Sequence, residues 1–506
     1  MTAKTVRLDW PTDCPELLSQ LIQGVTDPNT VVASSAHFEH VRSQTHTQAQ
    51  LVQLVGDVRL RALKLMGSCV KVMASKVVNK RQFREISGQL FMGVYGIWLE
   101  KYRTPPQGDA SGIVEWCGVE ARTCLKLMRK LLLHGFGDIK KVPDSAVVMA
   151  TILEATATCE QRARQTVSTN QISAGGARGC DNAHNTARLL MKILVTAQAQ
   201  HPFGYIPYIA HTCNLAVNRI LEGRENNDGR VKYVPGEGER VVTSDDYLLL
   251  CLTLVKNCLC EVEYQDEEST DAQAAKREVS SVLTNQMVDA LVRVLVGQYF
   301  LLTTADLDEW RDSPEAFAMD AADLTLLEVR PCAEALFGEL VCRMKQAALP
   351  AVTNMIMTIF GNSGAAPCDP SDLQSVLIRD AVYNAIGMAS YDIHDTFDFK
   401  SFLVSTVLPD LKVHSSTLAA THPATDTAAR THSPAQTPSC NYYSIIRRRV
   451  AWLLMQWSDA CVFTEEEMQF LYVVVLTLHA GPNGAVVCLA TTNNEYMHIM
   501  NAHPHV

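Results

Sequence analysis

The stretch IIRRRVAWLLMQW at residues 445–457 decides the fold class. Its large apolar residues recur at intervals of three and four, and they are Ile446, Val450, Leu453, Leu454 and Trp457. An α-helix turns about 100° per residue, so this spacing gathers the apolar side chains on one face of a helix. The stretch therefore predicts an amphipathic helix whose apolar face must be covered by another element.

The same periodicity recurs in three other stretches of the chain. It is carried by Leu51, Leu54, Val55, Val58, Ala62, Leu65 and Met66, by Leu125, Met128, Leu131 and Leu132, and by Ile378, Ala381, Val382, Ala385, Ile386 and Ala389. No convincing alternation of period two is present, and Gly (26 of 506 residues) and Pro (20) are below average use. These features disfavour an all-β fold and predict an all-α chain.

Many amphipathic helices without a dividing linker must stack on one another, because none can bury its apolar face alone. The expected solution is a HEAT-repeat (armadillo-type) solenoid, a right-handed α-α superhelix whose repeats contain about 40–47 residues. We assign it to residues 1–411, with further HEAT helices at 441–480, and leave the tail at 481–506 unassigned. Since strict repeat identity is absent, one large irregular helical domain is the alternative.

Four segments interrupt the helical pattern. Three of them are predicted as long loops from their composition. Residues 165–181 are rich in Gly, residues 222–240 are rich in Gly, Asn and Glu, and residues 261–275 are acidic. Residues 412–440 are rich in Ser, Thr, Ala and Pro, and 414–440 hold almost no large apolar side chain. Such a composition cannot offset its ordering entropy, so we predict a disordered insertion there.

The search for catalytic and metal-binding patterns is negative. There is no phosphate-binding G-x-x-x-x-G-K-[ST] loop, no H-E-x-x-H and no G-x-S-x-G. His37 and His40 have a spacing that could bind a metal, but no second ligand pair accompanies them. The 16 cysteines occur mostly singly within apolar stretches, as buried cysteines do. We expect no enzymatic activity, no metal and no cofactor.

Charge and hydropathy restrict the classes of partner that the chain is expected to bind. The net charge of −10 disfavours nucleic acid as a direct partner, and no apolar run approaches the roughly 20 residues that span a bilayer. Residues 261–328 hold 16 acidic against four basic side chains. This excess indicates either solvated loops or a surface that attracts a basic partner. The candidates are Glu261, Glu263, Asp266, Glu267, Glu268, Asp271, Asp306, Asp308, Glu309 and Asp312.

Arg447, Arg448 and Arg449 begin the helix at 445–457. Three consecutive helical residues point about 100° apart, so these side chains cannot all face one partner. They form either a solvated helix start or a set of polar contacts on an inner helix. In the second case, one or two of them reach a neighbouring repeat or a carboxylate of a bound protein.

Several of these stretches together resemble the importin-β (karyopherin-β) nuclear transport receptors. The most specific are YFLLTTADLDEWRDSPEAF (299–317) and IIRRRVAWLLMQW (445–457). Others are VRLDWPTDCPELL (6–18), CLKLMRKLLLHGF (124–136), QHPFGYIPYI (200–209), RPCAEALFGEL (330–340), LIRDAVYNAIGMASYDIHDTFDF (377–399) and LPDL (408–411). Their order and approximate spacing fit from residue 6 to about residue 460.

The resemblance implies a HEAT-repeat receptor that shuttles between cytoplasm and nucleus. Such a receptor binds protein cargo, contacts the FG-repeat nucleoporins of the pore, and releases cargo when Ran-GTP binds. The acidic candidates then become a surface for basic cargo or for Ran. The family's N-terminal domain and C-terminal repeats do not match, so we expect a middle fragment with impaired Ran-GTP binding. A HEAT scaffold for protein complexes outside nuclear transport is the alternative.

Overall fold

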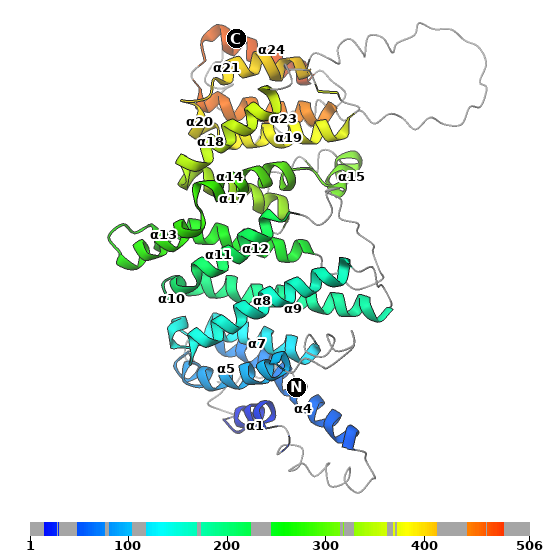
Figure 1. The fold of residues 1–506 in the computed structure, drawn as a ribbon, viewed down its shortest axis with the longest axis vertical. Helices are drawn as coiled ribbons and strands as arrows, with labels where there is room; N and C mark the ends of the chain where they lie inside the picture. The colour runs from blue at the N-terminus through cyan, green and yellow to red at the C-terminus, as the bar shows by residue number, and fades with distance from the viewer. Residues whose placement is uncertain are drawn as a thin grey trace, which may run out of the picture. The chain divides into compact units, whose positions relative to one another are not determined.

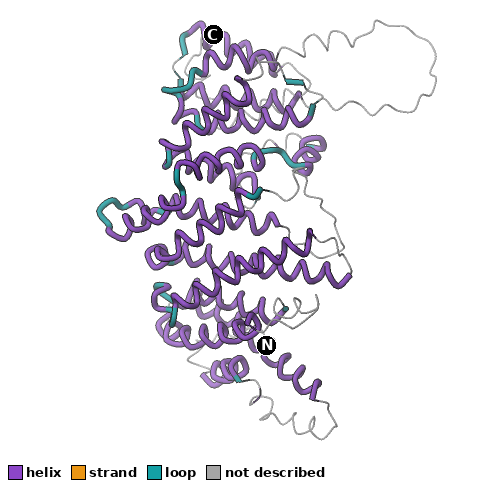
Figure 2. The backbone as a smooth tube through the Cα atoms, in the orientation of Figure 1, coloured by secondary structure: helices purple, strands orange, loops and turns teal. Residues whose placement is uncertain are grey.

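A computed structural model describes most of the chain's central part. The described residues are 15–27, 29, 48–75, 80–103, 118–168, 174–223, 244–313, 317, 328–361, 368–369, 372–411, 443–461 and 463–479. Helices and short helical turns make up these residues almost entirely, and no strand occurs among them (Figure 2). The predicted all-α fold class is confirmed.

The chain divides into two compact units, which are described separately. Unit 1 contains residues 1–217 and 235–282, and unit 2 contains residues 218–234 and 283–506. The helices of unit 1 are α1 (Pro15–Thr26), α4 (Gln48–Ser75), α5 (Lys80–Arg103), α7 (Val119–Gly135), α8 (Ser145–Ser168), α9 (Ala174–Gln200), α10 (Pro202–Tyr205), α12 (Ser244–Cys260) and α13 (Thr270–Val282). Helix α11 (Ile209–Leu221) begins in unit 1 and ends at residues assigned to unit 2.

Unit 1 is a stack in which a helix packs against its chain neighbour and against a helix of the next layer. Helix α7 contacts α5 on one side and α9 on the other, and α9 also contacts α8 and α12 (Figure 1). The predicted stripe Leu125, Met128, Leu131 and Leu132 of α7 is buried. Covering each apolar face by the next layer is the solenoid arrangement that the periodicity predicts.

Unit 2 repeats this construction. Its helices are α14 (Asn285–Val294), α15 (Thr304–Asp312), α17 (Val329–Arg343), α18 (Lys345–Ile356), α19 (Leu373–Met388), α20 (Ser390–Ile393), α21 (Phe399–Phe402), α23 (Tyr443–Ala460) and α24 (Glu465–His479). Three π-helical turns follow α14, α18 and α21, namely η6 (Leu295–Tyr299), η7 (Met357–Gly361) and η8 (Leu403–Val407). Helix α19 packs against η6 and α23, and the predicted apolar face of α23 is buried.

Three expectations about local structure need correction. Leu65 is 53% exposed, while Leu63 is fully buried, so the buried face of α4 contains Ala62, Leu63 and Met66 and excludes Leu65. The predicted loop at 165–181 is mostly helical, since α8 continues to Ser168 and α9 begins at Ala174. A long helix that is packed along the rest of its length extends through glycines at a cost of about 1 kcal/mol each.

The loop predicted at 261–275 is also shorter than expected. It contains the 3₁₀ turn η5 (Val262–Gln265), and α13 begins at Thr270 because buried Ala272 and Ala275 give that segment an apolar face. Four regions named in the sequence analysis lie outside the described residues. They are residues 224–240 of the predicted 222–240 loop, the 412–440 insertion, the 481–506 tail and the His37–His40 pair. Among described helices, none alone is long and apolar enough to cross a membrane, although Thr270–Val282 and Asn285–Tyr299 pass that test as a bent pair.

Candidate functional site

The first candidate is the acidic turn, which we define as residues 261–271 of unit 1. It follows α12 and is tied to the stack by Tyr264, whose buried hydroxyl donates to the Pro202 carbonyl at 2.9 Å. The amide Nε2 of Gln265 donates to the Leu259 and Glu261 carbonyls, each at 3.2 Å. These bonds hold the turn against the end of α12.

Most acidic side chains of this turn face solvent. Glu263, Asp266, Glu267, Glu268 and Asp271 are exposed, and Asp266 uses one oxygen to accept from the Glu268 backbone N–H at 3.0 Å. Their neighbour Val262 is 79% exposed. The turn therefore presents several carboxylates around an exposed apolar side chain.

Glu261 differs from the rest of the turn. It is half-buried, and it accepts a long hydrogen bond from Gln198 Nε2 at 3.4 Å. Its carboxylate therefore helps to join the turn to α9.

The other four acidic candidates lie in unit 2, and the structure separates their roles. Asp306 completes a capping box with Thr303, accepting from the Thr303 backbone N–H at 2.6 Å, and it also pairs with Arg330 at 3.4 Å. Because 14% of its side chain is exposed, Asp306 holds the start of α15 and is not part of an open surface. Asp308, Glu309 and Asp312 are exposed, and Asp308 pairs with Arg311 at 2.8 Å.

The arginine triplet is not a solvated helix start, because Arg448 and Arg449 are buried. Arg449 of α23 crosses to α19, where its Nε and Nη2 donate to Asp380 at 2.8 and 3.3 Å. Its Nη1 donates to the Asn384 side-chain oxygen at 2.7 Å, and Asn384 in turn donates to Glu334 of α17 at 2.8 Å. One arginine thus reaches neighbouring helices, as one alternative predicted.

Arg448 lies in the same buried region with a different kind of contact. Its guanidinium lies over the rings of Phe317 and Trp310, at 5.1 and 5.8 Å from their centroids. Burial, reinforced by the positive charges of Arg449 and Arg330, lowers the pKa of Arg448 to about 10. The side chain is therefore still charged at neutral pH. We call Arg330, Arg448, Arg449, Asp306, Glu334, Asp380 and Asn384 the arginine cluster.

A second buried ionic group in unit 2 is absent from the sequence-based candidates. Asp410 is 1% exposed, and its carboxylate accepts from Arg379 at 2.6 Å, from the Tyr383 hydroxyl at 2.6 Å and from the Cys368 backbone N–H at 2.8 Å. Burial and the nearby carboxylate raise the pKa of Tyr383 well above its ordinary value, so Tyr383 remains a donor. The sequence signal that could have indicated this group is the presence of polar residues within the apolar stretches 377–399 and 408–411.

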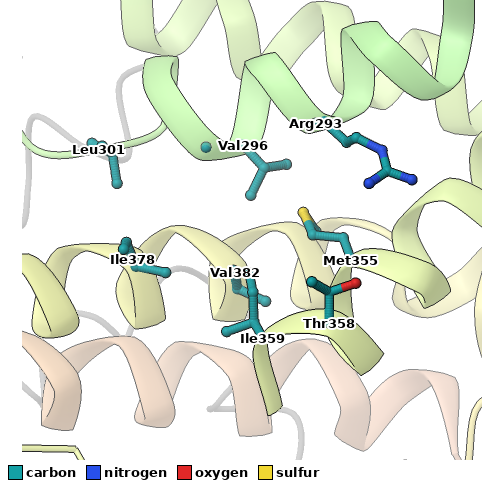
Figure 3. A pocket seen from close by; sticks show the side chains of 9 residues that line it. Arg293, Val296, Leu301, Met355, Thr358, Ile359, Ile378 and Val382 are labelled. Carbon is teal, nitrogen blue, oxygen red and sulfur yellow. The ribbon is translucent and has the colours of Figure 1, made fainter. Parts of the chain in front are cut away.

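Unit 2 also contains an apolar pocket of about 130 Å³. Figure 3 shows Val296 and Leu301 on one side of it, and Ile378, Val382 and Ile359 on the other. Arg293, Gly297, Met355 and Thr358 complete the lining. Arg293 is paired with Asp289 at 2.9 Å, so the one charged lining residue already has its counter-ion. The pocket is suited to a small apolar or aromatic group.

Comparison with known proteins finds similar proteins that are named as importins. The chain is 26% identical to importin-11 of Homo sapiens over 492 residues, which are 94% of this chain and 42% of that protein. It is 25% identical to importin-11 of Mus musculus, again over 94% of this chain and 42% of that protein. It is 22% identical to the importin beta-like protein kap113 of Schizosaccharomyces pombe over 45% of this chain and 20% of that protein. The predicted resemblance to the importin-β family is confirmed.

The fold comparison agrees with this result. The solved structure of Lph2, described as a bidirectional nuclear transport receptor of S. cerevisiae, matches 96% of this chain and 42% of that chain. Its TM-score is 0.63 at 16% identity, and the match supports the all-α solenoid fold. No family model matches the chain. The chain spans 42% of the length of the importin-11 relatives it matches.

Proposed function

We propose that this chain is part of a nuclear transport receptor that carries protein cargo from the cytoplasm into the nucleus. The observation that carries the proposal is the similarity to importin-11 across 94% of the chain. A stack of helix layers supports it, because such a stack offers long continuous surfaces to other proteins. Transport by binding and release needs no catalytic site, which agrees with the absence of the catalytic motifs sought in the sequence.

Cargo release follows from coupling between two ligands. We propose that Ran-GTP and cargo bind different curvatures of the stack, so that each lowers the affinity of the other by the same factor. The exposed carboxylates of the acidic turn are the proposed contact for a basic cargo surface or for Ran. Asp266, Glu267, Glu268 and Asp271 all face solvent, so a basic partner can reach them without disturbing the fold.

The apolar pocket of unit 2 is the proposed contact for FG-repeat nucleoporins. A cavity of 150 Å³ lined by apolar side chains binds benzene, so this pocket of about 130 Å³ has the right size for a phenylalanine ring. The pocket lies between η6, η7 and α19, and its half-buried lining residues Leu301, Ile359 and Ile378 are the ones that the ring of an extended peptide can contact (Figure 3).

The experiment fills this pocket and measures binding of FG-repeat peptides to the chain. Gly297 lines the pocket, and a Cβ added there meets no atom within 4 Å, so Gly297→Leu places an apolar side chain at the pocket wall. We expect the affinity for the peptide to fall at least fivefold. The matched control is Gly56→Leu on α4, where a Cβ also meets open space, and it should leave the affinity unchanged.

Two outcomes contradict the proposal at different levels. Equal binding by Gly297→Leu and wild type removes this pocket as the FG contact. No FG-peptide binding by the wild-type chain, together with stable partners that ignore the nucleotide state of Ran, favours the scaffold alternative. Binding of Ran-GTP and Ran-GDP measured in parallel supplies that second readout.

A further inference from the structure

We propose that Arg448, with the rings of Trp310 and Phe317, forms a recognition site for a carboxylate side chain of an acidic partner peptide. The site lies in unit 2, where α23 meets α15 and residue 317. It is separate from the acidic turn and from the apolar pocket. The inference does not rest on the proposed transport function, because an acidic peptide alone tests it.

The arginine cluster uses two of its three guanidinium groups internally. Arg449 is bound to Asp380 and Asn384, and Arg330 is paired with Asp306. For Arg448 the described residues provide no hydrogen-bond acceptor and no carboxylate within 4.0 Å. Its contacts are the two aromatic rings, and its Nε is buried without a partner. The Nε of Arg330 is also buried without a partner, but Arg330 has Asp306 as its counter-ion, whereas Arg448 has neither an acceptor nor a paired carboxylate among the described residues.

This state is unusual for an arginine with 8% of its surface exposed. A buried donor without an acceptor destabilises the protein, and a buried charge without a counter-ion does so more strongly. A carboxylate offers two oxygens that match the planar guanidinium, and it supplies both the missing acceptors and the missing charge. Arg448 is thus preorganised for a ligand of this chemistry.

The aromatic neighbours favour binding of such a group. Trp310 and Phe317 pack edge to face at 5.6 Å, and the indole Nε1 donates to Ser444 at 3.3 Å, which fixes the ring beside α23. The rings attract the guanidinium by its charge and accept no conventional hydrogen bond, so they leave its donors for a ligand. They also exclude water, which strengthens an ion pair formed there.

Charge balance favours one carboxylate over a phosphate dianion. Arg330 and Arg449 are each neutralised by an aspartate, so Arg448 contributes one positive charge without a directly bound counter-ion. The carboxylates of Asp380 and Glu334 are close enough to affect the Arg448 charge. They would repel a second negative charge on the ligand, and a singly charged group fits better.

The test uses the full chain and a fluorescein-labelled hexaglutamate peptide at low ionic strength. We compare wild type with Arg448→Met and Arg448→Lys by fluorescence anisotropy. Removing the guanidinium should weaken binding at least tenfold, and lysine should restore only part of it because it lacks the planar fork. The matched control is Arg311→Met, an exposed arginine paired with Asp308, and it should change the affinity by less than twofold.

A second measurement separates direct contact from loss of folding. In a chain labelled with ¹⁵N in arginine side chains, the Nε–H signal that disappears in Arg448→Lys belongs to this residue. Hexaglutamate should shift that signal, and hexaglutamine should not. Equal affinity of wild type and both Arg448 variants, no binding to wild type, or an unshifted signal would overturn the site. A shift with inorganic phosphate but not with hexaglutamate would overturn the assignment to a carboxylate.

Discussion

The acidic turn of unit 1 and the arginine cluster of unit 2 each include a dense run of charge in the sequence, but the fold uses these charges differently. The acidic turn lies between two helices, and Glu263 and Glu267 face solvent. The arginine cluster lies on faces of α17, α19 and α23 that are covered by other helices, and Arg449 is 6% exposed. Charge density alone therefore does not distinguish a contact surface from an internal network.

The difference has an energetic consequence. Exposed ion pairs contribute about 0–1 kcal/mol, because water already solvates both groups. Removing one partner of a buried pair costs about 3–5 kcal/mol, because the remaining charge is left without solvent or counter-ion. Substitutions in the arginine cluster should therefore lower stability, and substitutions in the acidic turn should change binding with little effect on stability.

The largest effect is expected for Asp380→Ala. This change leaves Arg449 buried without its carboxylate, so the free energy of unfolding should fall by about 3–5 kcal/mol. Urea unfolding followed by circular dichroism measures it. The control is Asp308→Ala, which breaks an exposed pair and should cost about 1 kcal/mol or less. Similar costs for the two variants would show that burial does not distinguish the pairs.

An intermediate effect is expected for Asp306→Ala. The change removes the capping box of α15 and the partner of Arg330, so we expect a loss of about 1–2 kcal/mol. Asp306→Asn keeps an acceptor for the Thr303 N–H and should recover part of this loss. Thermal unfolding of the three proteins tests the order. An alanine variant as stable as wild type would show that Asp306 does not stabilise the start of α15.

The smallest effect on stability, and a clear effect on binding, is expected in the acidic turn. Replacing Asp266, Glu267, Glu268 and Asp271 together by serine should change the free energy of unfolding by about 1 kcal/mol or less, because all four are exposed. Binding of an oligolysine peptide should weaken, and its dependence on salt should flatten. Titrations across a salt series measure both quantities.

The control for the acidic turn is a double variant elsewhere in the chain. Glu465→Ser with Glu466→Ser removes two exposed carboxylates at the start of α24. It should leave oligolysine binding closer to wild type than the turn variant does. Equal weakening by the two variants would indicate a response to net charge and would remove the acidic turn as a specific contact.

Much of the fold followed from local patterns. The spacing of Leu125, Met128 and Leu131 predicted a buried helix face, and the structure has it in α7. The periodicity at 445–457 likewise predicted α23. Such predictions succeed because an amphipathic helix must bury its apolar stripe, whichever partner covers it. Loop lengths were predicted less well, since α9 begins within a Gly-rich segment, and α13, whose Ala272 and Ala275 are buried, begins within an acidic one.

Sequence by itself determined the helical class, the family resemblance and the position of an acidic segment. Only the tertiary structure decided which charges are available to a partner, because an ion pair such as Arg449 with Asp380 joins residues 69 apart in the chain. The same holds for the pocket between Val296 and Val382, which belong to different helical elements. Local spacing fixes which side of a helix is apolar, and the packing of layers fixes what that side meets.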